Sequence, residues 1–170
     1  MEDRESEPEL VLVFSGKRKS GKDYEHGLDL NRLLGPGPYK ERYRADMIHW
    51  GESCRNKDPG FFCHLATRGA REPVWVVSDA RRLSDLCWFQ SKFPHQTKSV
   101  RVQCSDTTRS QRGWDFTPGV DDAESECGLD SGVDFDWIIT NEADAPPLDE
   151  QLKPVLKLAQ EAASSVINIL

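Results

Sequence analysis

The chain has 170 residues and a formal net charge of -7 at pH 7. That is long enough for one domain with a buried core, and the negative charge argues against general nucleic-acid binding. Five cysteines without paired spacing indicate a reducing compartment, the cytosol by default. No apolar run reaches the length of a membrane span, and the acidic N-terminus has no apolar signal region, so we expect no membrane partner.

Short apolar runs alternate with helical patterns along the chain. We expect strands over residues 10–14, 73–78, 99–104 and 135–140. We expect helices over residues 24–34, 39–55, 58–68, 82–93 and 106–114, and from residue 148 onward. Residues 117–130 are expected to form a loop and a short helix with a solvated or helix-capping acidic face. The alternation predicts a parallel sheet in an α/β fold, as a single domain over residues 10–170 after a flexible acidic stretch over residues 1–9.

The residues that follow the first strand form a phosphate-binding motif. Gly16 and the pair Gly21-Lys22 have the spacing of a P-loop, whose backbone N–H groups surround phosphate oxygens while the lysine reaches the β/γ-phosphates. Asp23 stands where Ser or Thr is usual, and a carboxylate beside a triphosphate suggests an intervening Mg²⁺. The local basic residues suit an anionic small molecule. The residues of this segment are Gly16, Lys17, Arg18, Lys19, Ser20, Gly21, Lys22 and Asp23.

The spacing after this motif is short. Only 24 residues separate Phe14 from Tyr39, where the next strong helix begins. That interval has to hold the P-loop, its helix and any returning strand, whereas a βαβ unit needs about 30 residues or more. No apolar, strand-like run occurs between Asp23 and Tyr39. We therefore expect that the strand which normally follows the P-loop helix is missing.

Arginines follow the second predicted strand. Arg81 and Arg82 come at its carboxyl end, where open α/β sheets bind their ligands. Two guanidinium groups facing a P-loop suit a second substrate that carries a phosphate. Asp79 could hold Mg²⁺ through water or cap the following helix, and the sequence leaves both possibilities open.

Further cations follow a similar pattern. Arg109 and Arg112 lie three residues apart on the predicted helix after the third strand, and could close over phosphates as a lid. Weaker single candidates are Lys40, Arg44 and Arg55 before the second strand and Arg101 in the third. Many cations with Mg²⁺ suit phosphoryl transfer to an acceptor that is already a phosphate, because such an acceptor needs neutralisation and in-line positioning and no general base.

Several segments of the chain closely resemble animal-type phosphomevalonate kinase. They are LVLVFSGKRKSGKD, YKERYRADMIHWGE, DPGFFC, VWVVSDARR, QRGWDFTPGVDDAESECGLD and FDWIIT, which run from Leu10 to about Asn141 in the family's order. The resemblance implies a three-layer P-loop fold like that of nucleoside monophosphate kinases. It also implies Mg²⁺-dependent transfer of the ATP γ-phosphoryl to 5-phosphomevalonate, giving 5-diphosphomevalonate and ADP, in a monomeric enzyme of isoprenoid and sterol synthesis.

The resemblance also implies roles for individual residues. Gly16–Asp23 would wrap ATP, and Lys22 would neutralise the transferred phosphoryl with Lys17, Arg18 and Lys19 adding positive field. Arg112 and Asn141 would lie near the nucleotide, and Asp23 and Asp79 are the candidate Mg²⁺ ligands. The candidate contacts to phosphomevalonate are Arg81, Arg82, Arg55, Lys40, Arg44, Arg101, Arg109 and Ser131.

The chain departs from the family pattern in two places. Asp23-Tyr24 runs directly into Glu25-His26-Gly27-Leu28, where the family has about one helix, one strand and a Lys-bearing loop between the two motifs. His64 stands where the family has Arg. Because the P-loop helix orients the glycine loop, we expect a destabilised protein with weak or absent kinase activity. The alternatives are a shortened, catalytically poor form that binds nucleotide or a partner and, less well supported, a generic nucleoside monophosphate kinase.

Overall fold

The computed structural model describes residues 7–15, 38–119, 121–122 and 124–167. The chain divides into two compact units, Met1–Arg18 with Thr67–Leu170, and Lys19–Ala66. The helix expected over residues 24–34 lies outside the described residues. The assignment of residues 10–170 to a single domain stays a prediction.

The first unit contains a parallel sheet, as the sequence predicts. Its strands are β1 (Leu10–Ser15), β2 (Val74–Ala80), β3 (Thr97–Gln103) and β4 (Trp137–Thr140), in the spatial order β2-β1-β3-β4. Every pairing between neighbours is parallel. The four strands begin or end within three residues of the expected positions, and the predicted α/β class is confirmed.

The central strand β1 is buried on both faces because it lies between β2 and β3 and between two layers of helix. Val11, Leu12 and Val13 are almost fully inaccessible to solvent, which explains the continuous apolar run that central parallel strands require. The pairing with β2 shifts register between Val13 and Ser15, so that Ser15 lies opposite Ala80. This irregularity comes directly before Gly16, the first residue of the P-loop motif.

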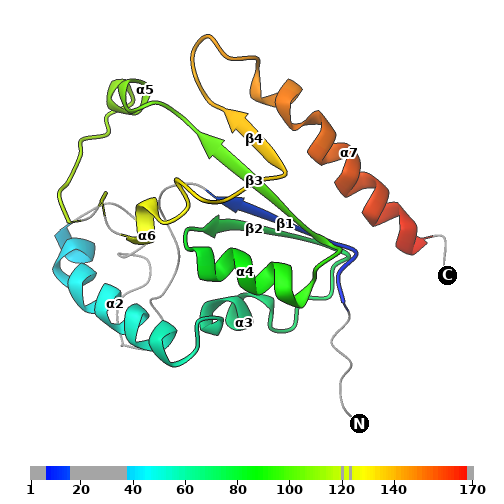
Figure 1. Cartoon of the computed structure of the whole chain (residues 1–170), viewed down its shortest axis with the longest axis horizontal. Coiled ribbons are helices and arrows are strands. Elements are labelled where there is room, and N and C mark those ends of the chain that lie inside the picture. The colour runs from blue at the N-terminus through cyan, green and yellow to red at the C-terminus, as the bar shows by residue number, and fades with distance from the viewer. Residues whose placement is uncertain (1–6, 16–37, 120, 123, 168–170) are drawn as a thin grey trace. The chain divides into compact units, whose positions relative to one another are not determined.

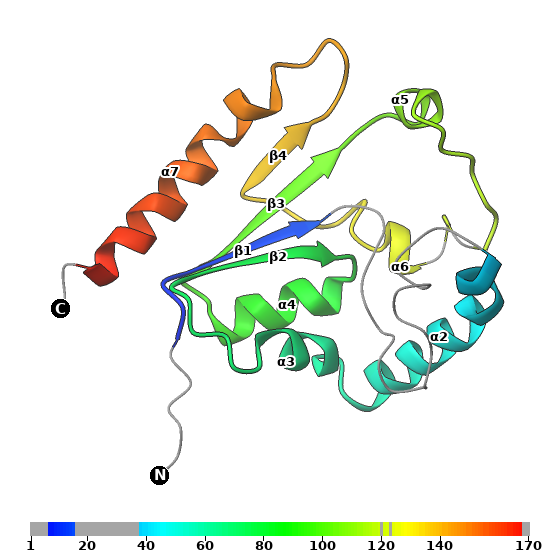
Figure 2. The ribbon, with the colours of Figure 1, turned by 180° about the vertical axis from the view of Figure 1, so that it is seen from behind.

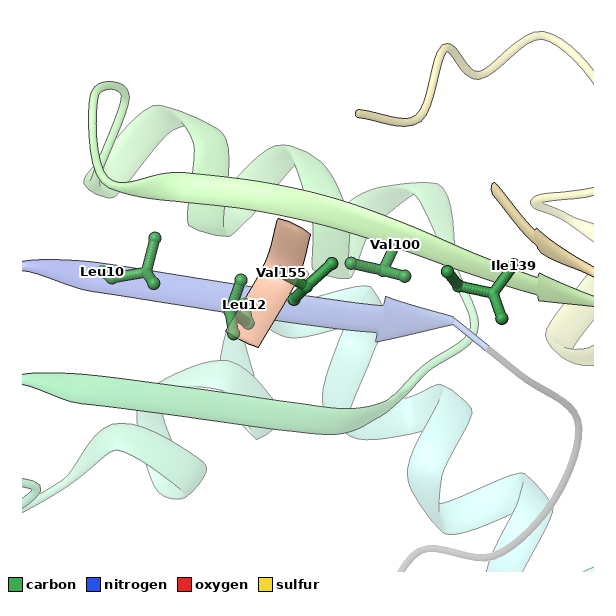
Figure 3. Packing of buried hydrophobic residues seen from close by; sticks show 5 residues of the cluster. All are labelled: Leu10, Leu12, Val100, Ile139 and Val155. Carbon is green, nitrogen blue, oxygen red and sulfur yellow. The ribbon is translucent and has the colours of Figure 1, made fainter. Parts of the chain in front are cut away.

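One face of the sheet packs against helix α7 (Leu148–Ile167), as Figures 1 and 2 show. Leu10, Leu12, Val100 and Ile139 point from three strands toward Val155 of this helix (Figure 3). Apolar side chains that are each almost fully buried contribute about 1.5–3 kcal/mol apiece, so this cluster is a substantial part of the core of the unit. Pro154 lies within the helix, where proline supplies no backbone N–H for the helical hydrogen bonds.

The opposite face packs against helix α4 (Leu83–Lys92). Leu86, Phe89 and Phe93 recur at intervals of three and four residues and are buried, as expected of an amphipathic helix. The hydroxyl of Thr97 donates to the carbonyl of Phe89 at 2.9 Å, which ties the start of β3 to the end of α4. Together α4 and α7 give the helix–sheet–helix layering that the sequence predicts.

Strand β2 is an outer strand of the sheet in the described part of the chain. Val76 lies on the same face as Val74, which packs in the α7 cluster, yet Val76 is 62% exposed. An apolar side chain so exposed on a strand is unusual for a complete α/β sheet, whose two faces are normally covered. The exposure accords with the expectation that the chain lacks structure after the P-loop.

The second unit contains helix α2 (Pro38–Lys57) and most of helix α3 (Phe61–Thr67). Trp50 contacts Phe61 and Phe62 edge to face, with ring centroids 6.3 and 5.8 Å away. The guanidinium of Arg55 lies over the Phe62 ring at 4.4 Å. These aromatic contacts hold the two helices together.

Two predicted helix boundaries are wrong. The helix expected from residue 58 begins at Phe61, because the carboxylate of Asp58 accepts from the backbone N–H of Gly60 at 2.9 Å and closes a turn before the helix. The helix expected over residues 106–114 is shorter, because Gly113 adopts a φ of +82° and turns the chain out of the helix. None of the described helices has the length and apolar character needed to cross a membrane.

Candidate active site

Polar side chains gather where the strands of the first unit end. Ser15 closes β1, Arg81 follows β2 directly, and Arg101 lies near the end of β3 opposite Ser15. The chain passes from β2 across β1 to β3, so the carboxyl ends of β1 and β3 form the topological switch point at which such sheets bind ligands. Helices α5 (Asp106–Gln111) and α6 (Glu124–Cys127) lie beyond these strand ends (Figures 1 and 2).

Arg81 is held by a carboxylate from a distant part of the chain. Its Nη1 donates to Oε1 of Glu126 at 2.8 Å, and the side chains are 19% and 7% exposed. The second oxygen of Glu126 is buried and has no hydrogen-bond partner in the described structure. A buried carboxylate is tolerated only when a cation or several donors face it, so the guanidinium of Arg81 offsets part of the cost of burying Glu126.

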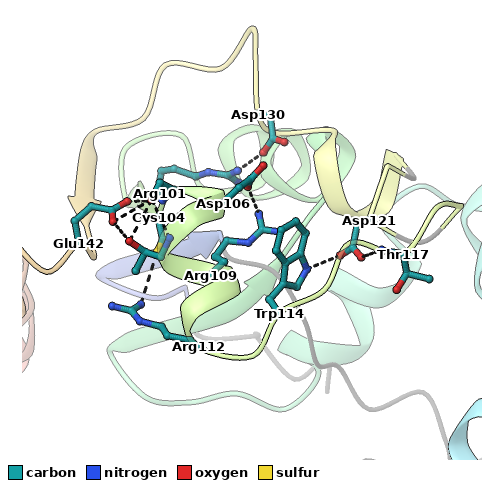
Figure 4. A network of polar contacts seen from close by, with 12 residues as sticks. Arg101, Cys104, Asp106, Arg109, Arg112, Trp114, Thr117, Asp121, Asp130 and Glu142 are labelled. Atoms are coloured by element: carbon teal, nitrogen blue, oxygen red, sulfur yellow. Dashed lines mark hydrogen bonds and ion pairs between the residues drawn. The ribbon is translucent and has the colours of Figure 1, made fainter.

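Arg101 joins three segments at the same edge of the sheet. Its Nη1 donates to the hydroxyl of Ser15 at 2.7 Å, and its Nη2 forms an ion pair with Asp130 (Figure 4). Its guanidinium also lies 5.9 Å from the centre of the Phe135 ring. Because Ser15 is the residue before Gly16, Arg101 places a positive charge beside the start of the P-loop motif.

Helix α5, on which the lid arginines were predicted, is fixed at its amino end by two caps. The hydroxyl of Ser105 accepts from the N–H of Thr108 at 3.2 Å, which is an N-cap. Glu142, which follows β4, accepts from the Ser105 N–H and hydroxyl and from the Thr108 hydroxyl. The hydrogen bond from Thr108, then those from Ser105, together with the charge of Arg112, hold the pKa of Glu142 below its usual value.

Arg109 packs locally and does not extend over the strand ends. Its guanidinium lies 3.6 Å from the centre of the Trp114 ring, and Nη1 pairs with Asp106 at 3.2 Å (Figure 4). The turn at Gly113 brings Trp114 back onto the helix, where its N–H donates to the carbonyl of Arg109 at 3.0 Å. The Trp114 ring in turn donates to buried Asp121 at 3.2 Å.

Arg112 contacts the other residue expected near the nucleotide. Its Nη2 donates to the carbonyl and to the side-chain oxygen of Asn141, each at 3.2 Å, while Nη1 approaches the sulfur of Cys104 at 3.7 Å. Arg112 and Asn141 come from different segments, one after α5 and one after β4. The structure thus places side by side the two residues that the resemblance assigned to the nucleotide.

Arg82 and Asp79 flank the end of β2. Arg82 occupies the N-cap of α4, and its backbone N–H donates to Asp85 at 3.4 Å. The alternative that Asp79 caps this helix is therefore wrong, because β2 extends through Asp79 to Ala80 and the cap falls at Arg82. The possibility that Asp79 holds Mg²⁺ stays a prediction, and its side chain lies outside the described structure.

Most of the other predicted site residues lie outside the described residues or belong to the unit that is described by itself. The P-loop residues Gly16 to Asp23 lie outside the described residues, and so do the side chains of Lys40 and Arg44 on α2. Arg55 belongs to the unit Lys19–Ala66, which is described by itself. Ser131 is exposed one residue after Asp130. No group of three or more His, Cys, Asp or Glu residues that could hold a metal occurs in the described ranges.

The acidic stretch was misread from the sequence. Asp121 and Glu126 are buried and not solvated. Asp121 accepts from the N–H of Thr117 and from the Trp114 ring, while Glu126 pairs with Arg81. Sequence reasoning missed Glu126, Asp130 and Glu142 as partners of the arginines. The available signal was an excess of arginines at strand ends, which require carboxylates close by when they are only partly exposed.

A parallel sheet covered by helices on both faces, with arginines gathered at its carboxyl edge, is the architecture of a P-loop kinase-like protein. Comparison with known proteins narrows this class. A family model described as phosphomevalonate kinase matches residues 24–95. A phosphomevalonate kinase of Drosophila melanogaster is 37% identical over 180 residues, covering 86% of this chain and 94% of that protein. The chain belongs to the phosphomevalonate kinase family.

The comparison with the Drosophila protein also bears on the short spacing after the P-loop. Since 86% of 170 residues is about 146, an alignment over 180 positions includes about 34 that this chain lacks. The family match begins at Tyr24, the residue immediately after Asp23. Both facts agree with an internal segment missing at the junction of Asp23 and Tyr24, as the sequence predicted.

Proposed function

We propose that this protein transfers the γ-phosphoryl group of ATP to 5-phosphomevalonate, giving 5-diphosphomevalonate and ADP. The observation that carries the proposal is the pair of arginines at the carboxyl ends of β2 and β3, the two strands that flank β1. Arg81 follows β2, and Arg101 bonds to Ser15 at the end of β1. Guanidinium groups match phosphate oxygens in geometry and keep their charge at every physiological pH.

The proposed chemistry fits the residues present at this edge. An acceptor phosphate is already a nucleophilic anion, so the reaction needs no side chain to remove a proton. The obstacle is electrostatic repulsion between the acceptor and the triphosphate, which positive charges and in-line positioning overcome. Arg81 and Arg101 would neutralise the acceptor, with Arg82, Arg55, Lys40, Arg44, Arg109 and Ser131 as further proposed contacts.

On the nucleotide side, Gly16–Asp23 would surround the ATP phosphates and Lys22 would stabilise the transferred group. Arg112 and Asn141, which contact each other at 3.2 Å, would lie against the nucleotide. Binding there would require Arg112 to exchange some of its contacts with Asn141 for contacts with ATP. This is a modest rearrangement, because both side chains are at least partly exposed.

Mg²⁺ would be held beside the ATP phosphates and would offset their negative charge. The ion usually takes only one or two carboxylates from the protein and fills its other positions with phosphate oxygens and water. Asp23, at the end of the P-loop motif in the sequence, and Asp79, near the carboxyl end of β2, are chemically suited to that limited role. When bound, the ion would neutralise charge that develops on the leaving phosphate.

The proposed setting is the mevalonate route to isoprenoids and sterols, in a cytosolic enzyme that acts as a monomer. We expect this chain to turn over more slowly than its Drosophila relative, because the missing segment includes structure that orients the P-loop. Val76, 62% exposed on the sheet, is the observation that accords with this expectation. The second candidate, a nucleotide-binding or interaction protein with little catalysis, rests on the same missing segment.

The test is direct detection of 5-diphosphomevalonate after incubation of the purified chain with ATP, Mg²⁺ and 5-phosphomevalonate. A Lys22→Met variant serves as the matched control. The proposal predicts product above that control at a rate below the Drosophila enzyme. Ligand binding without product above the control would favour the second candidate, and phosphorylation of nucleoside monophosphates instead would favour a generic nucleotide kinase.

A further inference from the structure

The segment from Asp121 to Asp130 supplies carboxylates to both strand-end arginines. Glu126 pairs with Arg81, which follows β2, and Asp130 pairs with Arg101 on β3. The two acidic residues are four positions apart, on α6 and in the turn that follows it. One short segment therefore fixes two guanidinium groups that come from separate strands.

The pair between Glu126 and Arg81 has features that a purely stabilising contact would lack. The partners are 45 residues apart in sequence, and the Glu126 side chain is 7% exposed. One of its oxygens bonds to Arg81 while the other is buried without a hydrogen-bond partner in the described structure. Because an unsatisfied buried oxygen costs free energy, and a buried ion pair is weak evidence of stabilisation, this arrangement calls for another explanation.

We propose that Glu126 is a positioning residue that sets the guanidinium of Arg81 in the orientation needed to bind the acceptor phosphate of 5-phosphomevalonate. The inference rests on the proposed function, since it assigns a role within that same site. Glu126 does not touch the substrate and acts through Arg81.

The physical argument concerns the freedom of the arginine side chain. An unrestrained arginine side chain loses rotamer entropy when it is fixed by a ligand. The contact at 2.8 Å with Glu126 fixes the side chain before the substrate arrives, so that less entropy remains to be lost on binding. A guanidinium has five N–H donors, and an ion pair at Nη1 does not exhaust them.

The experiment measures the dissociation constants of 5-phosphomevalonate and of Mg-ATP separately, by titration calorimetry on the full chain. The variants are Glu126→Ala, Glu126→Gln, Arg81→Ala and the double variant Arg81→Ala/Glu126→Ala. We expect Glu126→Ala to weaken the binding of 5-phosphomevalonate about tenfold. Glu126→Gln should weaken it about threefold, because the amide oxygen still accepts a hydrogen bond from Arg81, although a weaker one. Affinity for Mg-ATP should change less than about twofold in each.

The double variant separates positioning from general support. If Glu126 acts through Arg81, its removal has no further effect once Arg81 is gone, and the double variant binds 5-phosphomevalonate as Arg81→Ala does. Additive effects, or an equal loss of affinity for both ligands, would overturn the inference. Glu150→Gln is the matched control, since Glu150 is an exposed carboxylate that pairs with Lys153 on α7, and we expect unchanged affinities.

The outcomes distinguish this inference from the proposed function. Thermal unfolding of each variant checks that it folds, and Glu126→Gln, which keeps the size of the side chain, carries the test if Glu126→Ala does not fold. No binding of 5-phosphomevalonate by the unaltered chain would contradict the proposed function and this inference together. Binding that Arg81→Ala weakens and neither Glu126 variant changes would overturn the positioning role alone.

Discussion

The two groups of arginines in the sheet-containing unit are held in different ways. Arg81 and Arg101 pair with carboxylates from the segment Asp121–Asp130, and they are partly buried at the ends of strands. Arg109 and Arg112 instead belong to α5 and its end, and they contact a neighbouring tryptophan and an asparagine. The first pair is fixed by long-range contacts in a rigid sheet, and the second sits on a short helix held mainly at its amino end.

This difference suggests that the two groups of arginines bind different ligands. A binding site for an anionic acceptor benefits from cations that are already in place, because preorganisation reduces the entropy lost on binding. A lid has to close over the phosphates, so its cations suit an element with few buried contacts and exposed hydrogen bonds. We therefore propose that the strand-end arginines bind the acceptor and that Arg112 and Asn141 bind the nucleotide.

The largest expected effect is the loss of Arg81. Arg81→Ala should raise the dissociation constant of 5-phosphomevalonate about 100-fold, because charge-assisted hydrogen bonds to a phosphate contribute about 2–3 kcal/mol. Affinity for Mg-ATP should be unchanged when measured by the same calorimetric titration. Arg71→Ala provides the control, since Arg71 is exposed before the start of β2. An equal loss of affinity for both ligands would contradict the distinction between the two groups of arginines.

A smaller effect is expected at the end of α5, and it concerns the affinity for Mg-ATP and not for 5-phosphomevalonate. Arg112→Ala should weaken Mg-ATP about tenfold through the loss of a partly exposed, charged contact, and leave 5-phosphomevalonate nearly unaffected. Fluorescence competition with a labelled ATP analogue measures the change. If Arg112→Ala instead weakened 5-phosphomevalonate alone, both groups of arginines would belong to the acceptor.

The next effect concerns the attachment of α5. Glu142→Ala removes the carboxylate that accepts from Ser105 and Thr108, so the amides of residues 105–112 should exchange hydrogen several-fold faster. The lowered pKa of Glu142 means that its contribution is complete above the ordinary value of 4.5 and is lost as the pH falls through the folded pKa. Exchange measured by mass spectrometry at neutral pH should be unaltered in β1, and faster exchange there would indicate general loosening.

The smallest effect lies at the amino ends of the strands. Asp136 accepts from the N–H and hydroxyl of Ser99 at 2.8 and 2.9 Å and pairs with Lys98. Burial raises its pKa, but the bonds from Ser99 and the charge of Lys98 outweigh burial and lower it below 3.8. Asp136→Asn should reduce the free energy of unfolding at pH 7 by less than about 1 kcal/mol, because the carboxylate is partly exposed.

The pH dependence of that effect has a definite sign. A lowered pKa gives stability that is complete above pH 3.8 and is lost as the pH falls through the folded value. Urea unfolding should therefore show the difference between Asp136→Asn and the unaltered chain at pH 7 and a smaller difference below pH 3.8. The affinities for 5-phosphomevalonate and Mg-ATP should not change. A change in either affinity would show that the amino ends of the strands also influence the site.

Sequence reasoning predicted the sheet well because its signals are local. The continuous apolar run of β1 and the placement of Arg81 after a strand both follow from a few consecutive residues. Asn141 directly follows β4, and Arg112 ends the helix that follows β3, so both could be expected near the same edge of the sheet. Parallel topology brings such positions together without any knowledge of loop structure.

Other parts of the site could not be predicted, because they depend on how loops fold back. Glu126 looked like one of several solvated acids, and only the tertiary structure shows that it is buried against Arg81, 45 residues away. The early end of α5 depends on a positive φ at Gly113, a conformation that the sequence allows but does not require. Asp79 was an equally good cap for α4 until β2 proved to extend through it.

The most direct test of the account is thermal unfolding of the purified chain alone, with 5-phosphomevalonate, with Mg-ATP and with both, beside the Arg81→Ala variant. A ligand that binds only the native state raises the midpoint, by an amount equivalent to about 2.7 kcal/mol at 100 times its dissociation constant. The account predicts one cooperative transition that rises with each ligand, and a rise with 5-phosphomevalonate that Arg81→Ala abolishes. A midpoint that 5-phosphomevalonate does not move, or moves equally in Arg81→Ala, would contradict the account.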